Sequence, residues 1–187
     1  MKLVLGLGNL GAEYKETRHN CGFKVVELCA AFFHLKMKKR CFRLYESAKL
    51  TTLNETYLFI KPLTYMNNSG EILRYFKNVK ASDIIVICDQ MDLPLSFIRI
   101  KKGGGDAGHN GLKSIIKNLK GEKDFTRIYV GIGRPEKDKS VVEHVLGVEE
   151  NKEQFYQGIE KANEALKALI NGEPIDRLMQ QYNVKIK

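Results

Sequence analysis

Short apolar runs and apolar stripes at helical spacing alternate along most of this chain. Strands are expected where aliphatic and β-branched residues run together and stop at glycine, proline or polar residues, over Lys2–Leu7, Phe42–Leu50, Thr56–Ile60, Asp83–Cys88, Leu95–Ile100 and Thr126–Ile132. Helices are expected where apolar residues recur at helical spacing, over Gly22–Phe33, Ser69–Phe76, His109–Leu119, Glu149–Asn171 and Pro174–Tyr182.

This order of elements favours one α/β domain over residues 1–187. We expect three layers, with a mixed twisted sheet, helices on both of its faces and a C-terminal helical tail. A chain of this length buries a substantial core, and no linker, repeat or low-complexity segment interrupts it. No apolar stretch is long enough to span a bilayer, so no membrane association is expected.

A glycine motif at the end of the first predicted strand invites a nucleotide-binding interpretation. Gly6-Leu7-Gly8-Asn9-Leu10-Gly11 spells the dinucleotide pattern, which requires a helix to begin at its third glycine. The residues that follow are polar, and a convincing helix begins only near Gly22. Nucleotide binding is therefore disfavoured. The flanking glycines instead let a substrate approach Asn9 closely.

Charge points to a polyanionic partner. Lys and Arg number 31 against 22 for Asp and Glu, a net charge of +9. Cations that neutralise phosphates release counterions, so this excess favours nucleic acid, with a merely solvated basic surface as the alternative. Candidate contacts cluster in the middle third, at Arg99, Lys101, Lys102, Lys113, Lys117, Lys120, Arg127 and Arg134. The four cysteines lack zinc or redox spacing, and we expect reduced thiols in a cytoplasmic protein.

Polar residues follow the predicted strands and should meet in one crevice, because sites in α/β sheets form at the carboxyl ends of strands. They are Asn9, His19, Asn67, Asp92 and Asn110. No serine lies in a nucleophile-elbow pattern and no cluster has metal-ligand spacing, so no metal is expected. A histidine base oriented by an aspartate, with an amide that donates to an oxyanion, suits attack of water on an ester.

Each of these residues also has a purely structural interpretation. A lone histidine in a polar loop is often a solvated surface group, and Asn beside Gly is common in turns. Asp92 before Leu-Pro could form only an Asx-type turn. Cys21 lies two residues from His19, but neighbours so close in a loop rarely form a catalytic pair.

Several segments resemble the motifs of the bacterial-type peptidyl-tRNA hydrolases, in the same order. They are Leu5–Gly11 with Tyr14, Thr17–Asn20 and Gly22; Lys61–Gly70; Asp89–Pro94; Gly103–Gly105 with Gly108–Ser114; Gly131–Pro135; and Val145–Gly147. The resemblance covers the chain from the first strand to about Gly147, and the helical tail matches in type and length. It implies a monomeric enzyme that hydrolyses the ester between an N-blocked peptide and the tRNA 3′ end, without metal or cofactor.

The resemblance also implies roles for individual residues. His19 would activate water, Asp92 would support it, and Asn9 would contact the substrate and the transition state. Substrate contacts are expected from Tyr14, Tyr65, Met66, Asn67 and Asn110. The tRNA acceptor region, rather than a protein partner, would meet the basic residues, with phosphate contacts expected at Lys101, Lys102, Lys113, Arg127 and Arg134.

This chain departs from the family pattern in two places. Asp106-Ala107 stand before Gly108 where the family commonly has glycines, and Tyr129 stands where some members carry a basic residue. A relative that binds RNA without catalysis is the main alternative function, and a nucleotide-dependent oxidoreductase is a second. The presence of His19, Asp92 and Asn9 favours the enzyme.

Overall fold

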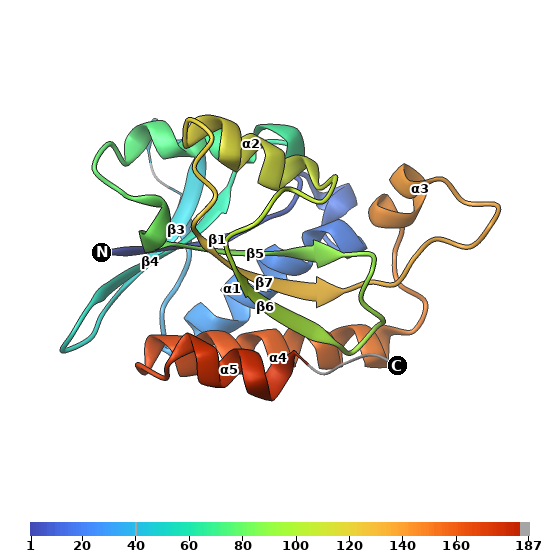
Figure 1. Ribbon diagram of the computed structural model, residues 1–187. Helices are drawn as coiled ribbons and strands as arrows, with labels where there is room; N and C mark the ends of the chain where they lie inside the picture. Colours follow the sequence, from blue (N-terminus) through green and yellow to red (C-terminus); the bar gives the residue numbers. More distant parts are fainter. Residues whose placement is uncertain (40, 184–187) are drawn as a thin grey trace.

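The computed structural model describes residues 1–39 and 41–183, whose strands form one mixed sheet (Figure 1). The strands are β1 (Lys2–Gly6), β2 (Lys38–Lys39), β3 (Tyr45–Thr51), β4 (Thr56–Pro62), β5 (Ile84–Gln90), β6 (Ile98–Lys102) and β7 (Thr126–Gly131). Their order across the sheet is β2-β3-β4-β1-β5-β7-β6. Neighbours from β4 to β7 are parallel, whereas β2, β3 and β6 pair antiparallel at the two edges.

Helical segments cover both faces of the sheet (Figure 1). The α-helices are α1 (Cys21–Phe32), α2 (Asn110–Asn118), α3 (Val141–Leu146), α4 (Lys152–Ile170) and α5 (Ile175–Tyr182). Four 3-10 segments are η1 (Ala12–Tyr14), η2 (Arg18–Asn20), η3 (Met66–Tyr75) and η4 (Ala81–Asp83). An apolar cluster under α2 and η3 and another against α1, α4 and α5 fill the two faces. The predicted three-layer α/β architecture is confirmed.

The differences from the predicted elements have local causes. The segment expected as an α-helix over Ser69–Phe76 is the 3-10 segment η3. Strand β6 begins at Ile98 rather than Leu95, because Ser96 adopts a left-handed φ of 63° that ends an extended chain. Helix α3 and strand β2 were not expected; both are short, and short elements carry little periodicity.

Close packing of α1 against the strand ends places the loop that carries His19. A side chain at Gly22 would overlap the backbone of Leu7 and Ile87, so only glycine allows the start of α1 to touch β1 and β5 there. The segment after Gly11 forms η1 rather than an α-helix, so the motif lacks the helix N-terminus that dinucleotide binding requires. None of the described helices combines the length and apolar composition needed to cross a membrane.

Candidate functional site

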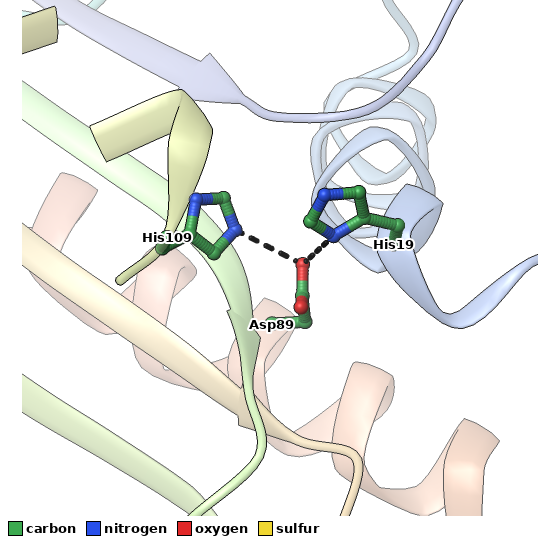
Figure 2. Close-up of side chains that lie close together, drawn as sticks. All are labelled: His19, Asp89 and His109. Carbon is green, nitrogen blue, oxygen red and sulfur yellow. Dashed lines mark hydrogen bonds and ion pairs between the residues drawn. The ribbon is translucent and has the colours of Figure 1, made fainter. Parts of the chain in front are cut away.

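His19 and Asp89 form the centre of the site. His19 lies on η2, between β1 and α1, and its Nδ1 is 2.7 Å from Oδ1 of Asp89 near the end of β5 (Figure 2). Both side chains are buried. A carboxylate only accepts hydrogen bonds, so the proton of His19 lies on Nδ1 and Nε2 keeps its lone pair. Nε2 makes no hydrogen bond within residues 1–39 and 41–183, which leaves it available as a base.

A second histidine shares the same carboxylate oxygen. Nε2 of His109 lies 3.1 Å from Oδ1 of Asp89, from the opposite side to His19 (Figure 2). Nδ1 of His109 accepts hydrogen bonds from the backbone N–H groups of Gly111 at 3.1 Å and Leu112 at 3.3 Å, so this side chain caps α2. With Nδ1 occupied as an acceptor, Nε2 carries the proton and donates to Asp89.

Asp89 is the fixed negative charge of the site. Burial by itself would raise the pKa of this carboxyl, but His19 and His109 outweigh burial through their charge and hydrogen bonds and hold its pKa far below the ordinary range. Asp89 is therefore ionised at neutral pH. An ionised carboxylate beside Nδ1 of His19 fixes the imidazole tautomer and stabilises the imidazolium that forms when Nε2 takes a proton.

The structure corrects the predicted partner of His19. Asp92 lies in the turn beyond β5, with a side chain that is 54% exposed, and accepts from Arg134 through Nε at 2.9 Å and Nη2 at 2.6 Å. Strand β5 runs to Gln90, and Asp89 shares the face of Ile85 and Ile87, which pack in the cluster on the α1 side. The carboxylate that contacts His19 is thus three residues earlier than predicted.

Asn9 is held by hydrogen bonds on nearly all of its polar groups. Its N–H donates to Oδ1 of Asn20 at 2.8 Å, and its carbonyl accepts from Nδ2 of Asn20 at 3.0 Å. Its side-chain Oδ1 accepts from the N–H of Met66 at 2.8 Å. This bond fixes the amide orientation, and Nδ2 remains a donor with no hydrogen bond in the described chain. Asn20, which sets this geometry, was part of a motif but received no role from the sequence.

Helix α3 forms an apolar wall opposite the two histidines. Val141, Val142 and Val145 line a cavity of about 120 Å³ together with His19, Asp89 and His109. We call it the catalytic cavity because it contains the candidate catalytic pair. Ser140 and Glu143 form a reciprocal capping box at the start of α3, with the Ser140 N–H at 2.9 Å from Oε2 of Glu143 and the Glu143 N–H at 3.2 Å from Oγ of Ser140. This local pattern was the available signal for α3.

A buried ion pair connects α3 to the segment that carries His19. Nε of Arg18 lies 2.6 Å from Oε2 of Glu149, and Nη1 of Arg18 donates to the carbonyl of His144 at 3.0 Å. The N–H of Arg18 also donates to the carbonyl of Gly147 at 3.0 Å. Burial raises the pKa of Glu149, but hydrogen bonds from the Asn151 backbone and Arg18 outweigh it and leave that pKa below its ordinary value. The residue next to His19 therefore anchors the wall of the cavity.

The remaining residues that were predicted to contact the substrate lie in two groups. Asn67 and Asn110 line one hollow of about 430 Å³ between η3 and α2, and Asn110 also lines the catalytic cavity. Met66 is buried beneath this region. Tyr14 and Tyr65 meet edge to face, with ring centroids 6.4 Å apart. The structure thus brings the asparagines together in one place and the two tyrosines together in another.

A basic cavity adjoins the catalytic one. Arg99, Lys101 and Tyr129 line a hollow of about 280 Å³, which shares Gln90 and Ala107 with the catalytic cavity. Lys101 lies on the α2 side of β6, whereas Lys102, next in the strand, follows the face of Ile100 toward α4. Lys113 lines the hollow between η3 and α2. The five predicted phosphate contacts therefore do not form one surface.

Two of those five cations are engaged elsewhere. Arg127 was expected to be a surface contact, but its side chain is fully buried under the glycine loop. Its Nη2 donates to the carbonyl of Gly104 at 2.6 Å, and its guanidinium lies 4.0 Å from the Phe125 ring centroid. Burial lowers the pKa of Arg127. Arg134 is exposed and paired with Asp92. Arg99, by contrast, lines the basic cavity.

The departure at Asp106-Ala107 shapes the loop between the two cavities. Oδ1 of Asp106 accepts from the N–H of Gly108 at 2.9 Å, and the carbonyl of Asp106 accepts from the N–H of His109 at 2.9 Å. Ala107 takes a left-handed φ of 50°, which is uncommon for a residue with a side chain. Asp106 therefore closes the turn that delivers His109 to α2.

The three site residues could also be considered as metal ligands. One ligand atom from each of His19, Asp89 and His109 lies within 4.8 Å of the others. Both imidazoles, however, direct an N–H at the carboxylate, and Nδ1 of His109 already accepts from α2. A metal would have to displace these hydrogen bonds and the helix cap. The donor set suits proton transfer better than metal binding.

Comparisons with known proteins agree with this geometry. A family model described as peptidyl-tRNA hydrolase matches residues 3–187. The peptidyl-tRNA hydrolase of Shouchella clausii is 41% identical over 189 residues, which cover 98% of this chain and 100% of the relative. The peptidyl-tRNA hydrolase of Fusobacterium nucleatum is 42% identical over 191 residues, which cover 99% of this chain and 97% of the relative. A crystal structure of peptidyl-tRNA hydrolase from Acinetobacter baumannii has a TM-score of 0.88 and 33% identity, covering 98% of this chain and 95% of that chain.

Proposed function

Because this chain belongs to the peptidyl-tRNA hydrolase family, we propose that it hydrolyses the ester between an N-blocked peptide and the 3′ end of tRNA. The products are the free peptide and a tRNA that can be charged again. The observation that carries the proposal is the His19–Asp89 pair at 2.7 Å, with Nε2 of His19 unoccupied in the described chain.

We assign the reaction steps to the side chains of this site. Nε2 of His19 takes a proton from water while the water oxygen bonds to the ester carbonyl carbon. Asp89 stabilises the imidazolium that results. The bond from carbon to the tRNA 3′ oxygen then breaks, and the imidazolium returns its proton to that oxygen. One water is consumed, one ester is cleaved, and His19 ends as it began.

Two further groups complete the proposal around the reacting carbonyl. Nδ2 of Asn9 is the donor assigned to the oxyanion, because every other polar group of Asn9 is already hydrogen-bonded. The valines of α3 offer apolar contact to the bound substrate. Asn67 and Asn110, in the hollow next to the catalytic cavity, are assigned to the peptide backbone and the tRNA end.

The RNA part of the substrate is assigned to the basic cavity and α2. Arg99 and Lys101 supply cations beside the catalytic cavity, and Lys113 supplies one on the other side of Asn110. Arg127 does not meet phosphate in this proposal; its hydrogen bond to Gly104 holds the loop above Lys101. Phosphate contacts of this kind position RNA without reading its sequence.

We place the enzyme in the cytoplasm as a monomer. Cys21, Cys29, Cys41 and Cys88 are free thiols, which fits a reducing compartment.

The test is single-turnover cleavage of an N-acetyl-aminoacyl-tRNA by wild type, His19→Asn and His34→Asn. His34 is exposed beyond the far end of α1 and has a φ of 55°, which asparagine tolerates, so His34→Asn is a matched control. Loss of the base should slow cleavage about 10²–10⁴-fold while tRNA binding persists. Failure of the wild type to cleave, with salt-sensitive tRNA binding retained, would instead establish a non-catalytic RNA-binding relative.

A further inference from the structure

Hollows on the α2 face of the molecule adjoin one another from the catalytic cavity to the far end of α2. The catalytic cavity shares Asn110 with the hollow between η3 and α2. That hollow shares Asn118 with a third one, of about 480 Å³, which we call the far hollow. Asn110 and Asn118 are the first and last residues of α2, so the far hollow lies about 12 Å along the helix from Asn110.

The far hollow is strongly basic. Arg74, Lys77, Lys80 and Lys120 line it, and Glu122 is its only acidic lining residue. All four cations are exposed, and none forms an ion pair within the part of the chain that the structure describes. Unpaired positive charges gathered around one hollow repel each other and create a positive electrostatic potential there. A bound anion would relieve this repulsion, so the hollow attracts anions.

Helix ends account for only part of this cluster. Cations near the C-terminal end of a helix stabilise it. This effect explains Lys120, which lies just after the end of α2 with a left-handed φ of 56°. Arg74 likewise lies in the last turn of η3, whereas Lys77 and Lys80 follow that segment, and all three come from a different part of the chain than Lys120. Arg74 and Arg43 both lie over the Tyr75 ring, at 5.1 and 4.6 Å from its centroid, which extends the basic surface beyond the hollow.

The path to the far hollow is preformed. The N–H of Gly70 on η3 donates to Oγ of Ser114 on α2 at 3.0 Å. A side chain at Gly70 would overlap the Ser114 carbonyl, so the two elements approach as closely as their backbones allow. The intervening hollow is lined by two lysines, Lys113 and Lys117, against one acidic residue, Glu71, so its charge stays positive between the two ends.

We propose that the far hollow is a second RNA-backbone site, which binds phosphates of the substrate tRNA away from its 3′ end. This inference rests on the proposed function. The ester lies in the catalytic cavity, the RNA follows the groove between η3 and α2, and Arg74, Lys77, Lys80 and Lys120 neutralise phosphates at the other end. The contact is to backbone charge, so it adds affinity for tRNA as a class rather than for one sequence.

The test compares two triple variants that remove the same charge. Lys77→Gln/Lys80→Gln/Lys120→Gln empties the far hollow of its lysines. Lys36→Gln/Lys152→Gln/Lys161→Gln is the matched control, with Lys152 and Lys161 on α4 across the sheet and Lys36 after α1. Affinity for uncharged tRNA is measured over a range of salt concentrations. Single-turnover cleavage is measured on N-acetyl-aminoacyl-tRNA and on the same N-acetyl-aminoacyl ester of a CCA trinucleotide.

We expect the far-hollow variant to bind tRNA about tenfold more weakly and to lose about 1 from the salt slope for each lysine that meets phosphate. Its cleavage of the trinucleotide ester should equal that of the wild type, and the control variant should retain tRNA affinity. An unchanged affinity and slope in the far-hollow variant would overturn the inference, as would equal losses in both variants. A wild type that binds tRNA but cleaves neither ester would overturn the proposed function instead. The binding data would then still show whether the far hollow contacts RNA.

Discussion

His109 joins a helix cap to the buried carboxylate of Asp89, because its Nδ1 accepts from the start of α2 while its Nε2 lies 3.1 Å from Oδ1 of Asp89. The cap fixes which ring nitrogen carries the proton, and that proton holds Asp89 in position for His19. Helix α2 is thereby connected to the candidate catalytic pair. Its N-terminus holds the carboxylate through His109, and its exposed side carries Lys113 and Lys117 along the hollow between η3 and α2.

Substitution of Asp89 should abolish most of the activity, whereas substitution of Asp92 should not. Asp89→Asn removes the charge that stabilises the His19 imidazolium, so single-turnover cleavage should fall about 10²–10⁴-fold. Asp92→Asn removes only an exposed ion pair with Arg134, which contributes little. Equal rates for the two variants would show that Asp89 has no catalytic part. Their tRNA affinities, measured alongside, separate chemistry from binding.

Substitutions at His109 should separate its two hydrogen-bonding roles. His109→Asn keeps a side-chain oxygen that can cap α2 but is too short to bring its amide N–H to Asp89, whereas His109→Ala removes both hydrogen bonds. Both should slow cleavage through kcat. Only His109→Ala should also lose about 1 kcal/mol of unfolding free energy, measured by denaturant titration. A normal kcat in His109→Asn would contradict a positioning role toward Asp89.

The stability of the fold should depend on acid through Asp89. Its folded pKa lies far below the unfolded value of about 3.9, so its contribution to stability is fully present above that value and is lost as pH falls further. Between about pH 5 and pH 2, the unfolding free energy of wild type should therefore fall more steeply than that of Asp89→Asn. Parallel curves from denaturant unfolding at several pH values would contradict this assignment.

The buried Arg18–Glu149 pair should be costly to break. Both side chains are only 10% exposed, so Glu149→Gln leaves Arg18 buried without its counter-charge and should lower the unfolding free energy by about 3 kcal/mol. Glu136→Gln breaks the exposed Lys139–Glu136 pair and should change the unfolding free energy by less than about 0.5 kcal/mol. Because Arg18 precedes His19 and anchors α3, Glu149→Gln should also slow cleavage.

Adjacent lysines of β6 should differ in their effect on RNA binding. Lys101→Gln should weaken tRNA binding and lower its salt slope by about 1, because Lys101 faces the basic cavity. Lys102→Gln removes the same charge from the opposite face and should leave the slope nearly unchanged. A salt titration of tRNA affinity measures both. Identical losses would show that the cavity has no special part in phosphate binding.

The sequence by itself determined the class of fold and several of the polar residues that gather at the candidate site. Apolar runs and helical stripes depend on neighbours along the chain, so they indicated the long strands and helices correctly. His19, Asn9, Asn67 and Asn110 follow strands or loops, and the sheet brings such positions to one end. Short elements such as α3 were missed, although the Ser140 and Glu143 capping box marked its start.

Only the tertiary structure decided which side chains meet. Asp89 and Asp92 are both carboxylates near the end of β5, and the choice between them depends on where the strand stops and which face each side chain takes. Arg127 is a cation in a basic region, but its burial beneath the glycine loop depends on packing across β6, β7 and that loop. Contacts between segments far apart in the chain are set by the folded sheet, and local sequence carries no record of them.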